Sequence, residues 1–306
     1  MHYFYKIHDF VLESQMIFPE LIEVPQQKSH IIIVENLVPY SLRSKIKTIF
    51  EGGLLYEKVE NQLLLFVKDA GRVLIEEGKI ITFERIDQAD DSTLRLYLLG
   101  SCLSFALMMQ GLFPLHGSVV TTKYGTAMFM GESGRGKSTI AAAFNAKGHE
   151  VLSDDVSIVK FNSNNIPIVF PSVRHIKLWN DSVDELGYDK KQLIKASSNW
   201  DKWQIGIGNS HDPQPSPLSI IYDLNPGEDK HLGISPIFGL EKLNVLLKNM
   251  HRPTGIEIFG LENAYFKYCT KLAKCLPVKK LSRSTEVFDI SRLYEAIMFD
   301  LTNLNA

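Results

Sequence analysis

Cysteine and net charge are both scarce in this chain, and each scarcity excludes a class of protein. Three cysteines among 306 residues are too few for a disulfide framework, and their spacings fit no zinc pattern. The 33 Lys and Arg residues nearly balance the 35 Asp and Glu residues, which removes the electrostatic case for a nucleic-acid coat or a polybasic membrane anchor. The sequence therefore predicts a cytoplasmic protein with reduced thiols that binds no nucleic acid and no membrane.

A long charge-free segment is the one feature that could suggest a membrane span. Residues 96–115 carry no charge, and twenty residues are enough to cross a bilayer. However, this segment contains two glycines, two serines, a glutamine and a proline, and no basic cluster flanks it. The N-terminus also lacks the basic region and apolar run of a secretory signal. We expect a buried core helix here.

Residues 1–91 are predicted to form a small β-rich N-terminal domain. Short apolar runs rich in β-branched residues predict strands at 31–34, 63–67, 73–75 and 80–83, with hairpin turns at 69–71 and 77–78. Residues 43–50 are a candidate short helix. We find no catalytic constellation in this part of the sequence.

Residues 92–306 are predicted to form an α/β catalytic domain, after a polar segment that can cap a helix beginning near Leu94. Tight turns between adjacent strands favour a mixed sheet. The predicted strands are 118–122, 126–130, 151–152 and 157–161, and the predicted helices are 137–146, 240–249, 261–276 and 289–301. Residues 197–236, rich in Gly and Pro, are predicted to be a loop, which is either a mobile functional segment or a plain connection.

One segment fits the phosphate-binding pattern G-x-x-x-x-G-K-[ST] at every fixed position. It reads Gly131-Glu132-Ser133-Gly134-Arg135-Gly136-Lys137-Ser138 and is followed by Thr139. It follows a predicted strand and opens a predicted helix, which is the context that the pattern requires. Glycines let backbone N–H groups turn toward phosphate oxygens, and the helix N-terminus adds positive dipole character. Residues 131–139 are therefore predicted to bind a nucleotide, with Lys137 on the β- and γ-phosphates and Ser138 on Mg²⁺.

Two adjacent acids, Asp154 and Asp155, follow the next predicted strand. Acids at the end of a strand beside a phosphate loop can hold Mg²⁺ directly or through water, and a second carboxylate can accept a proton from an attacking hydroxyl. The alternative is a solvated Asp-Asp turn. His116 precedes a strand that should neighbour the phosphate-loop strand, so its imidazole could lie near the γ-phosphate or the acids. A packed histidine is the alternative there.

Residues 115–159 resemble the catalytic domain of HPr kinase/phosphorylase. The family has a His-Gly pair, a phosphate loop, a Gly-His pair and an Asp-Asp pair in this order, and here these are His116-Gly117, residues 131–138, Gly148-His149 and Asp154-Asp155. The resemblance implies a P-loop, HPr-kinase-like and PEP-carboxykinase-like mixed-sheet core. It also implies ATP- and magnesium-dependent phosphorylation of a serine. His116 and Lys137 would then act at the phosphates, Ser138 and Asp154 on the metal side, and Asp155 as the proton acceptor.

The chain departs from this family in three places. The family's glutamate in a Glu-x-Arg-Gly segment has no match in residues 171–179, so that magnesium ligand is vacant or moved. The family's further catalytic arginine matches no residue clearly; Arg252 and Arg174 are the candidates, and a structural ion pair is the alternative for either. Residues 1–91 do not resemble the family's N-terminal domain, so phosphorolysis is not expected.

A looser pattern spans most of the chain: a β-rich N-terminal part, an apolar helix leading to Pro-Leu-His, the loop, the Asp-Asp, an Arg…Leu-Trp segment and a downstream Arg-Pro. In this pattern the chain is more closely similar to the HPr-kinase-like proteins of lasso-peptide biosynthesis. Those proteins phosphorylate the C-terminal serine of a precursor peptide, which implies the same acceptor here. The alternatives are an HPr-like protein, a small molecule, or no acceptor at all in a module that only binds ATP. The resemblance also implies a homo-oligomer, although no residue pattern identifies its interface.

Overall fold

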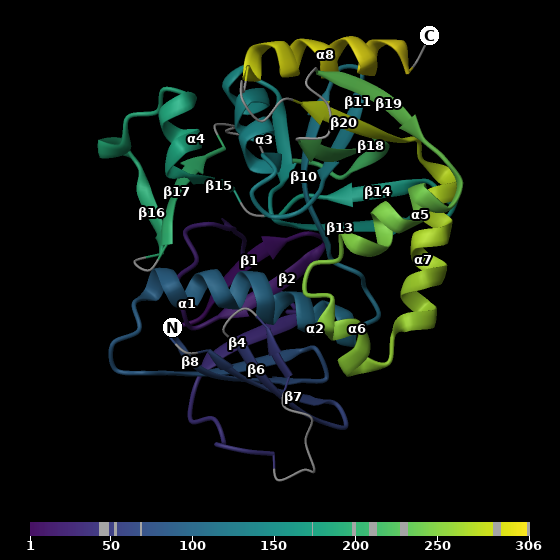
Figure 1. Ribbon diagram of the computed structural model, residues 1–306. Coiled ribbons are helices and arrows are strands. Elements are labelled where there is room, and N and C mark those ends of the chain that lie inside the picture. Colours follow the sequence, from purple (N-terminus) through teal and green to yellow (C-terminus); the bar gives the residue numbers. More distant parts are fainter. Residues whose placement is uncertain are drawn as a thin grey trace. The chain divides into compact units, whose positions relative to one another are not determined.

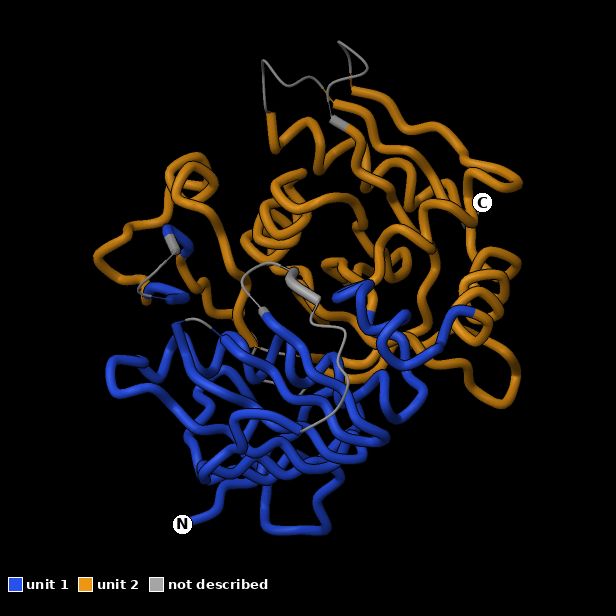
Figure 2. The backbone as a smooth tube through the Cα atoms, turned by 60° about the horizontal axis from the view of Figure 1, so that its bottom comes forward, with its two compact units in different colours: residues 1–114, 195–202, 251–262 blue, residues 115–194, 203–250, 263–306 orange. Residues whose placement is uncertain are grey.

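The computed structural model describes residues 1–306 except 43–48, 52–53, 68, 173, 198–199, 208–212, 227–231, 284–288 and 305–306. The chain forms two compact units, coloured separately in Figure 2. Unit 1 holds residues 1–114, 195–202 and 251–262, and unit 2 holds residues 115–194, 203–250 and 263–306. The predicted domain boundary between residues 91 and 92 stays a prediction.

Unit 1 contains a nine-stranded sheet in the order β3-β1-β2-β4-β9-β8-β7-β6-β5. Its strands are β1 (Tyr3–Ile7), β2 (Phe10–Ser14), β3 (Ile22–Glu23), β4 (Ile31–Glu35), β5 (Ile49–Glu51), β6 (Leu54–Val59), β7 (Gln62–Val67), β8 (Gly71–Glu76) and β9 (Ile80–Arg85). The predicted hairpins β7–β8 and β8–β9 are confirmed as antiparallel pairs. Of the helix predicted at 43–50, residues 43–48 lie outside the described residues, and Ile49 and Phe50 belong to β5 instead.

Residues 96–109 of the charge-free segment form the C-terminal part of a continuous helical stretch in unit 1. The stretch comprises α1 (Asp91–Tyr97), a π-helical turn (Leu98–Cys102) and α2 (Leu103–Met109). As predicted, a polar cap starts it, since the Asp90 side chain accepts a hydrogen bond from the Thr93 amide at 2.9 Å. By length and composition this helix could cross a membrane, but 67% of its apolar window is buried inside the structure. Phe105 packs edge-on against Tyr56 of β6, so α2 acts as a core helix of this unit.

Unit 2 contains a mixed eight-stranded sheet, as the tight turns predict (Figure 1). The order is β11-β10-β13-β14-β18-β20-β19, with β12 paired to β10 and β11 paired also to β18. The strands are β10 (Leu115–Thr122), β11 (Gly125–Met130), β12 (Glu150–Ser153), β13 (Val156–Phe161), β14 (Pro167–Phe170), β18 (Ser216–Pro226), β19 (Gly233–Ile237) and β20 (Val278–Arg283). A smaller sheet has the order β15-β17-β16, formed by β15 (His175–Trp179), β16 (Ile194–Ser197) and β17 (Trp200–Gly206).

Helices α3 (Lys137–Ala146) and α8 (Ile290–Asn303), both predicted from the sequence, share one apolar core with the eight-stranded sheet, and Val183 of α4 (Asn180–Glu185) also belongs to this core. Phe129 of β11 stacks on Tyr222 of β18, with ring centroids 5.6 Å apart, and also contacts Phe144 of α3. This packing fixes α3 against the strand that precedes it. The other helices are a 3₁₀ turn (Lys190–Gln192), α5 (Gly239–Lys248), α6 (Thr254–Phe259) and α7 (Glu262–Cys275).

The prediction of a loop over residues 197–236 is wrong for most of that segment. Strands β17, β18 and β19 occupy it, and β18 pairs in parallel with both β11 and β20. Of the prolines that suggested a loop, Pro213 and Pro215 precede β18 and Pro217 is its second residue, so they leave the central ladder intact. The mostly apolar residues 218–224 form the strand interior. Residues 208–212, which include His211 and Asp212, lie outside the described residues.

Candidate active site

The polar residues of the candidate site lie along one edge of the unit 2 sheet. Strands β11, β18 and β20 are mutually parallel in register, and β12 runs the same way because both β11 and β12 are antiparallel to β10. The carboxyl ends of these four strands and the beginning of β10 therefore meet at a single edge. In open α/β sheets, ligands bind outside the carboxyl ends of the strands.

The glycine-rich loop, residues 131–136, connects β11 to α3, which confirms the predicted strand–loop–helix order. Its three glycines have φ values of 135°, 82° and 101°, which side chains rarely tolerate. Gly131 also lies so close to β18 that a Cβ atom there would meet the Leu224 carbonyl oxygen at 2.9 Å. Lys137 is 6% exposed, and its Nζ donates to the carbonyl oxygens of Gly131 and Glu132 at 2.7 and 2.9 Å. The loop therefore curls around the ammonium group.

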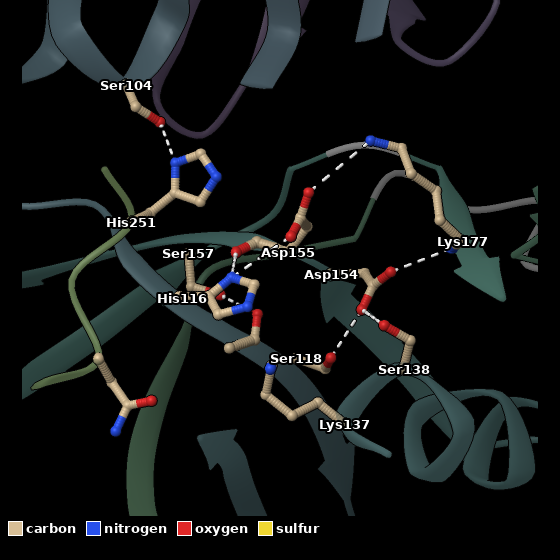
Figure 3. A network of polar contacts seen from close by, with 12 residues as sticks. Ser104, His116, Ser118, Lys137, Ser138, Asp154, Asp155, Ser157, Lys177 and His251 are labelled. Carbon is tan, nitrogen blue, oxygen red and sulfur yellow. Dashed lines mark hydrogen bonds and ion pairs between the residues drawn. The ribbon is translucent and has the colours of Figure 1, made fainter. Parts of the chain in front are cut away.

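Asp154 is a buried carboxylate, 3% exposed, and protein donors hold both of its oxygens (Figure 3). Oδ1 accepts hydrogen bonds from the hydroxyls of Ser118 at 2.6 Å and Ser138 at 2.8 Å. Oδ2 accepts from the Lys177 amide at 3.1 Å. These contacts fix the Ser138 hydroxyl at the beginning of α3, with its oxygen available as a metal ligand.

Asp155 has a different environment although it is the next residue. Its φ is 72°, which turns its side chain away from that of Asp154, and the side chain is 36% exposed. Its Oδ1 lies 3.3 Å from His116 Nδ1, and its Oδ2 lies 3.9 Å from Lys177 Nζ. His116 Nδ1 also lies 3.0 Å from the Asp155 carbonyl oxygen, within hydrogen-bond distance. Two carboxylates in such different surroundings are suited to two different tasks.

A cavity of about 570 Å³ opens beside the first residues of the loop. Asp223, at the carboxyl end of β18, lies in its wall, and burial raises the pKa of this carboxyl group while Lys248 opposes the effect. The lining residues are His116, Gly131, Glu132, Arg135, Asp223, Leu224, Asn225, Glu241, Asn244, Val245, Lys248, Asn249 and Met250. The cavity is polar and carries both signs of charge, so it suits a polar ligand.

Asn249 ties the loop to His116, and the sequence analysis missed this role. It is 7% exposed, and its Oδ1 accepts a hydrogen bond from the Gly131 amide at 2.8 Å. Its Nδ2 donates to the Val245 carbonyl oxygen at 2.7 Å, and its own carbonyl oxygen accepts from the His116 amide at 2.8 Å. An asparagine just after a helix is ordinarily a helix end, so spacing alone gave no signal.

The remaining predicted site residues have varied surroundings. Glu132 and Arg135 form an ion pair at 2.6 Å on the loop, and Arg135 lowers the pKa of Glu132. The Thr139 hydroxyl lies 2.9 Å from that of Ser182. Ser133 and Gly134 lie at the exposed tip of the loop. Arg252 belongs to unit 1, where its charge acts on Tyr97 and Cys102, so its assignment as catalytic stays a prediction.

The residues present suit a nucleotide and a magnesium ion. The oxygen donors Ser138 and Asp154 lie together, and Mg²⁺ prefers a few protein oxygens together with phosphate oxygens and water. The N-terminus of the ten-residue helix α3 and the glycine-rich loop offer amide donors for phosphate oxygens. The assignments of residues 131–139 to the nucleotide and of Ser138 and Asp154 to the metal stay predictions.

Comparison with known proteins gives little further information. No protein family matches the sequence, and no curated protein matches it. The structure of the Hpr(Ser) kinase/phosphatase from Coxiella burnetii is a structural neighbour, with a TM-score of 0.34 and 15% sequence identity. The match covers 62% of this chain and 94% of the other. A TM-score this low carries no argument about activity, so the function is argued from the residues of the site.

Proposed function

We propose that this chain is an ATP- and magnesium-dependent kinase that phosphorylates a serine of a peptide or protein. The observation that carries the proposal is the pair of unlike carboxylates beside the glycine-rich loop. Asp154 is buried and bonded to the Ser138 hydroxyl, whereas Asp155 is partly exposed and lies beside His116. One carboxylate thus supports the metal side of the site, and the other can reach a substrate hydroxyl.

Each residue then has a defined task in phosphoryl transfer. Loop amides and Lys137 hold the β- and γ-phosphates, and His116 lies on the γ-phosphate side. Asp155 accepts the proton of the serine hydroxyl while the serine oxygen bonds to the γ-phosphorus and the bond to the β-phosphate oxygen breaks, which releases ADP. Ser138 and Asp154 would hold Mg²⁺, which would supply positive charge to offset the charge of the phosphates during transfer. The protein's main contribution is positioning and electrostatic stabilisation.

We propose the C-terminal serine of a lasso precursor peptide as the acceptor, on the strength of the similarity to lasso-associated kinases. The cavity of about 570 Å³ next to His116 supports this acceptor class, since it has room for a short polar segment of chain. An HPr-like protein or a small molecule is the alternative acceptor. A module that binds ATP without transferring phosphate is the alternative from another class.

Replacing Lys137 with Ala tests the proposal. The wild-type protein, incubated with ATP, magnesium and a candidate precursor peptide, should add one phosphoryl group to the peptide, as read by mass spectrometry. The Lys137→Ala variant should lose this activity by at least about 100-fold, because an electrostatic contact to the transferring group is removed. Full activity of the variant would contradict the assignment.

The same assay identifies the acceptor. Peptides that end in Ser, in Ala or in amidated Ser should be labelled only when a free C-terminal serine is present. Equal labelling of internal serines would exclude the terminal-serine acceptor while leaving the kinase activity in place. ATP binding without labelling of any acceptor would favour the binding module.

A further inference from the structure

Arg283 lies at the same sheet edge as the residues described above, although the sequence analysis did not single it out. It is the last residue of β20, which pairs in parallel with β18 up to the register Pro226–Arg283. His116 and the two aspartates come from β10 and the β12–β13 turn on one side of β11, whereas Arg283 comes from the β18–β20 side. The glycine-rich loop therefore lies between the two groups.

The guanidinium group of Arg283 contacts the loop directly. Its Nη2 donates a hydrogen bond to the carbonyl oxygen of Arg135 at 3.2 Å. The same nitrogen lies 3.5 Å from the position that a Cβ atom on Gly136 would occupy. Because Gly136 has no side chain, the guanidinium can approach the backbone immediately before Lys137, where α3 begins.

The local electrostatics favour an anion at this position. Burial lowers the pKa of Arg283, Glu185 opposes this effect, and the charge of Arg135 adds to it. Lys137 adds a third, buried cation at the same loop. Glu132 pairs with Arg135 at 2.6 Å, so Arg283 and Lys137 carry the excess of positive charge at the loop. Excess positive charge is costly when it is partly desolvated, and phosphate oxygens would offset the cost. Arginine suits this task because its planar donors can bind two oxygens of one phosphate.

We propose that Arg283 is a further phosphate-contacting residue, which binds the polyphosphate chain of the nucleotide from the β18–β20 side of the glycine-rich loop. This inference rests on the proposed function for the identity of the ligand. It adds a cation to the site that neither the loop pattern nor the family resemblance assigned. The competing explanation is that Arg283 only supports the loop backbone through the Arg135 carbonyl.

Nucleotide binding to the full chain, measured by calorimetry without an acceptor, tests this inference. The ligands are ATP with magnesium and inorganic tripolyphosphate, and the variants are Arg283→Gln, Arg283→Lys and the control Arg292→Gln. Arg292 lies on α8 with a side chain 81% exposed, so its replacement makes the same change in net charge away from the loop. Arg283→Gln should raise the Kd of both ligands about 10- to 100-fold.

The other two variants sharpen the test. Arg283→Lys should recover part of the affinity, because it keeps the charge and loses the two-pronged geometry. The melting temperature of unliganded Arg283→Gln should stay within about 3 °C of that of Arg292→Gln, because glutamine can still donate to the Arg135 carbonyl.

Several results would overturn the inference. One is an equal Kd for tripolyphosphate in the Arg283→Gln and Arg292→Gln variants. Another is a loss of affinity in Arg283→Gln together with a large drop in its melting temperature, where Arg283→Lys binds no better than Arg283→Gln. That result would assign Arg283 a structural role. Wild-type protein that binds both ligands but phosphorylates no acceptor would contradict only the proposed function. Wild-type protein that binds neither ligand would contradict both.

Discussion

At the scale of single residues, the site depends on how backbone conformation separates two adjacent aspartates. Asp154 directly follows β12, and its Oδ1 accepts hydrogen bonds from the buried Ser118 and the partly buried Ser138. Asp155 adopts the left-handed region with φ 72° and is accessible beside His116. Aspartate is among the residues that tolerate left-handed backbone, so a tight turn at Asp155 can separate the two carboxylates.

Asparagine substitutions at the two positions should therefore have different effects. Asp155→Asn tolerates the same backbone conformation, so the variant should fold and bind ATP with a Kd within about threefold of wild type. Its turnover should fall by about 100- to 10,000-fold, because the proton acceptor is lost. Asp154→Asn should instead weaken magnesium-dependent ATP binding, because it removes the charge behind Ser138.

Steady-state kinetics and calorimetric titration of ATP with and without magnesium separate these two effects. Arg292→Gln is again a suitable control, since its side chain is exposed on α8. Near-normal turnover of Asp155→Asn would move the proton acceptor elsewhere. Lost turnover in Asp154→Asn with unchanged magnesium dependence would reverse the roles given to the two acids.

At the scale of secondary-structure elements, the close approach of the loop to β18 is the critical contact. Gly131 has φ 135°, and a Cβ there would lie 2.9 Å from the Leu224 carbonyl oxygen, which is backbone and cannot rotate away. Gly187 also has a positive φ of 71°, but nothing lies within 4 Å of its Cβ position. Comparing alanine substitutions at Gly131 and Gly187 therefore separates the free-energy cost of backbone strain from the cost of a steric collision.

Gly131→Ala should destabilise the protein by about 3 kcal/mol or more, because strain and collision add. Gly187→Ala should cost about 1 kcal/mol from strain alone. Urea unfolding of both variants measures the difference, and ATP titration of Gly131→Ala should show weakened binding because the loop must move. Equal destabilisation by the two substitutions would contradict the close packing of the loop on β18.

The elements around the glycine-rich loop could be predicted because local signals coincide there. An apolar strand, a glycine pattern and helical periodicity all lie within residues 126–146, and each rests on short-range physics. Strand β18 was missed because Pro213, Pro215 and Pro217 favoured a loop just before the mostly apolar residues 218–224. Asn249, Asp223 and Arg283 could not be predicted, since only the pairing of distant strands and helices brings them to the loop.

At the scale of the whole molecule, neither compact unit is a continuous piece of chain. Unit 1 is completed by residues 195–202 and 251–262 in addition to residues 1–114. Within this unit, the hydroxyls of Thr93 and Ser197 lie 3.0 Å apart, and the rings of Phe105 and Phe259 are 6.3 Å apart. A Cβ atom on Gly255 would lie 2.3 Å from the Met108 sulfur, so helices α2 and α6 are in close contact. Segments far apart in sequence therefore share one core.

This arrangement leads to a prediction for fragments of the chain, which also tests the predicted domain boundary. A fragment of residues 1–91 lacks α2, whose Phe105 covers the buried Tyr56, so its sheet would expose apolar surface to water. We expect this fragment to aggregate. Its unfolding in urea, followed by circular dichroism, should show no cooperative transition. A fragment of residues 1–114 restores α2 and should regain a cooperative transition at lower urea than the full chain, since α6 is still absent. Cooperative unfolding of the 1–91 fragment at the midpoint of the full chain would show that this part folds alone and that the boundary between residues 91 and 92 is a true domain boundary.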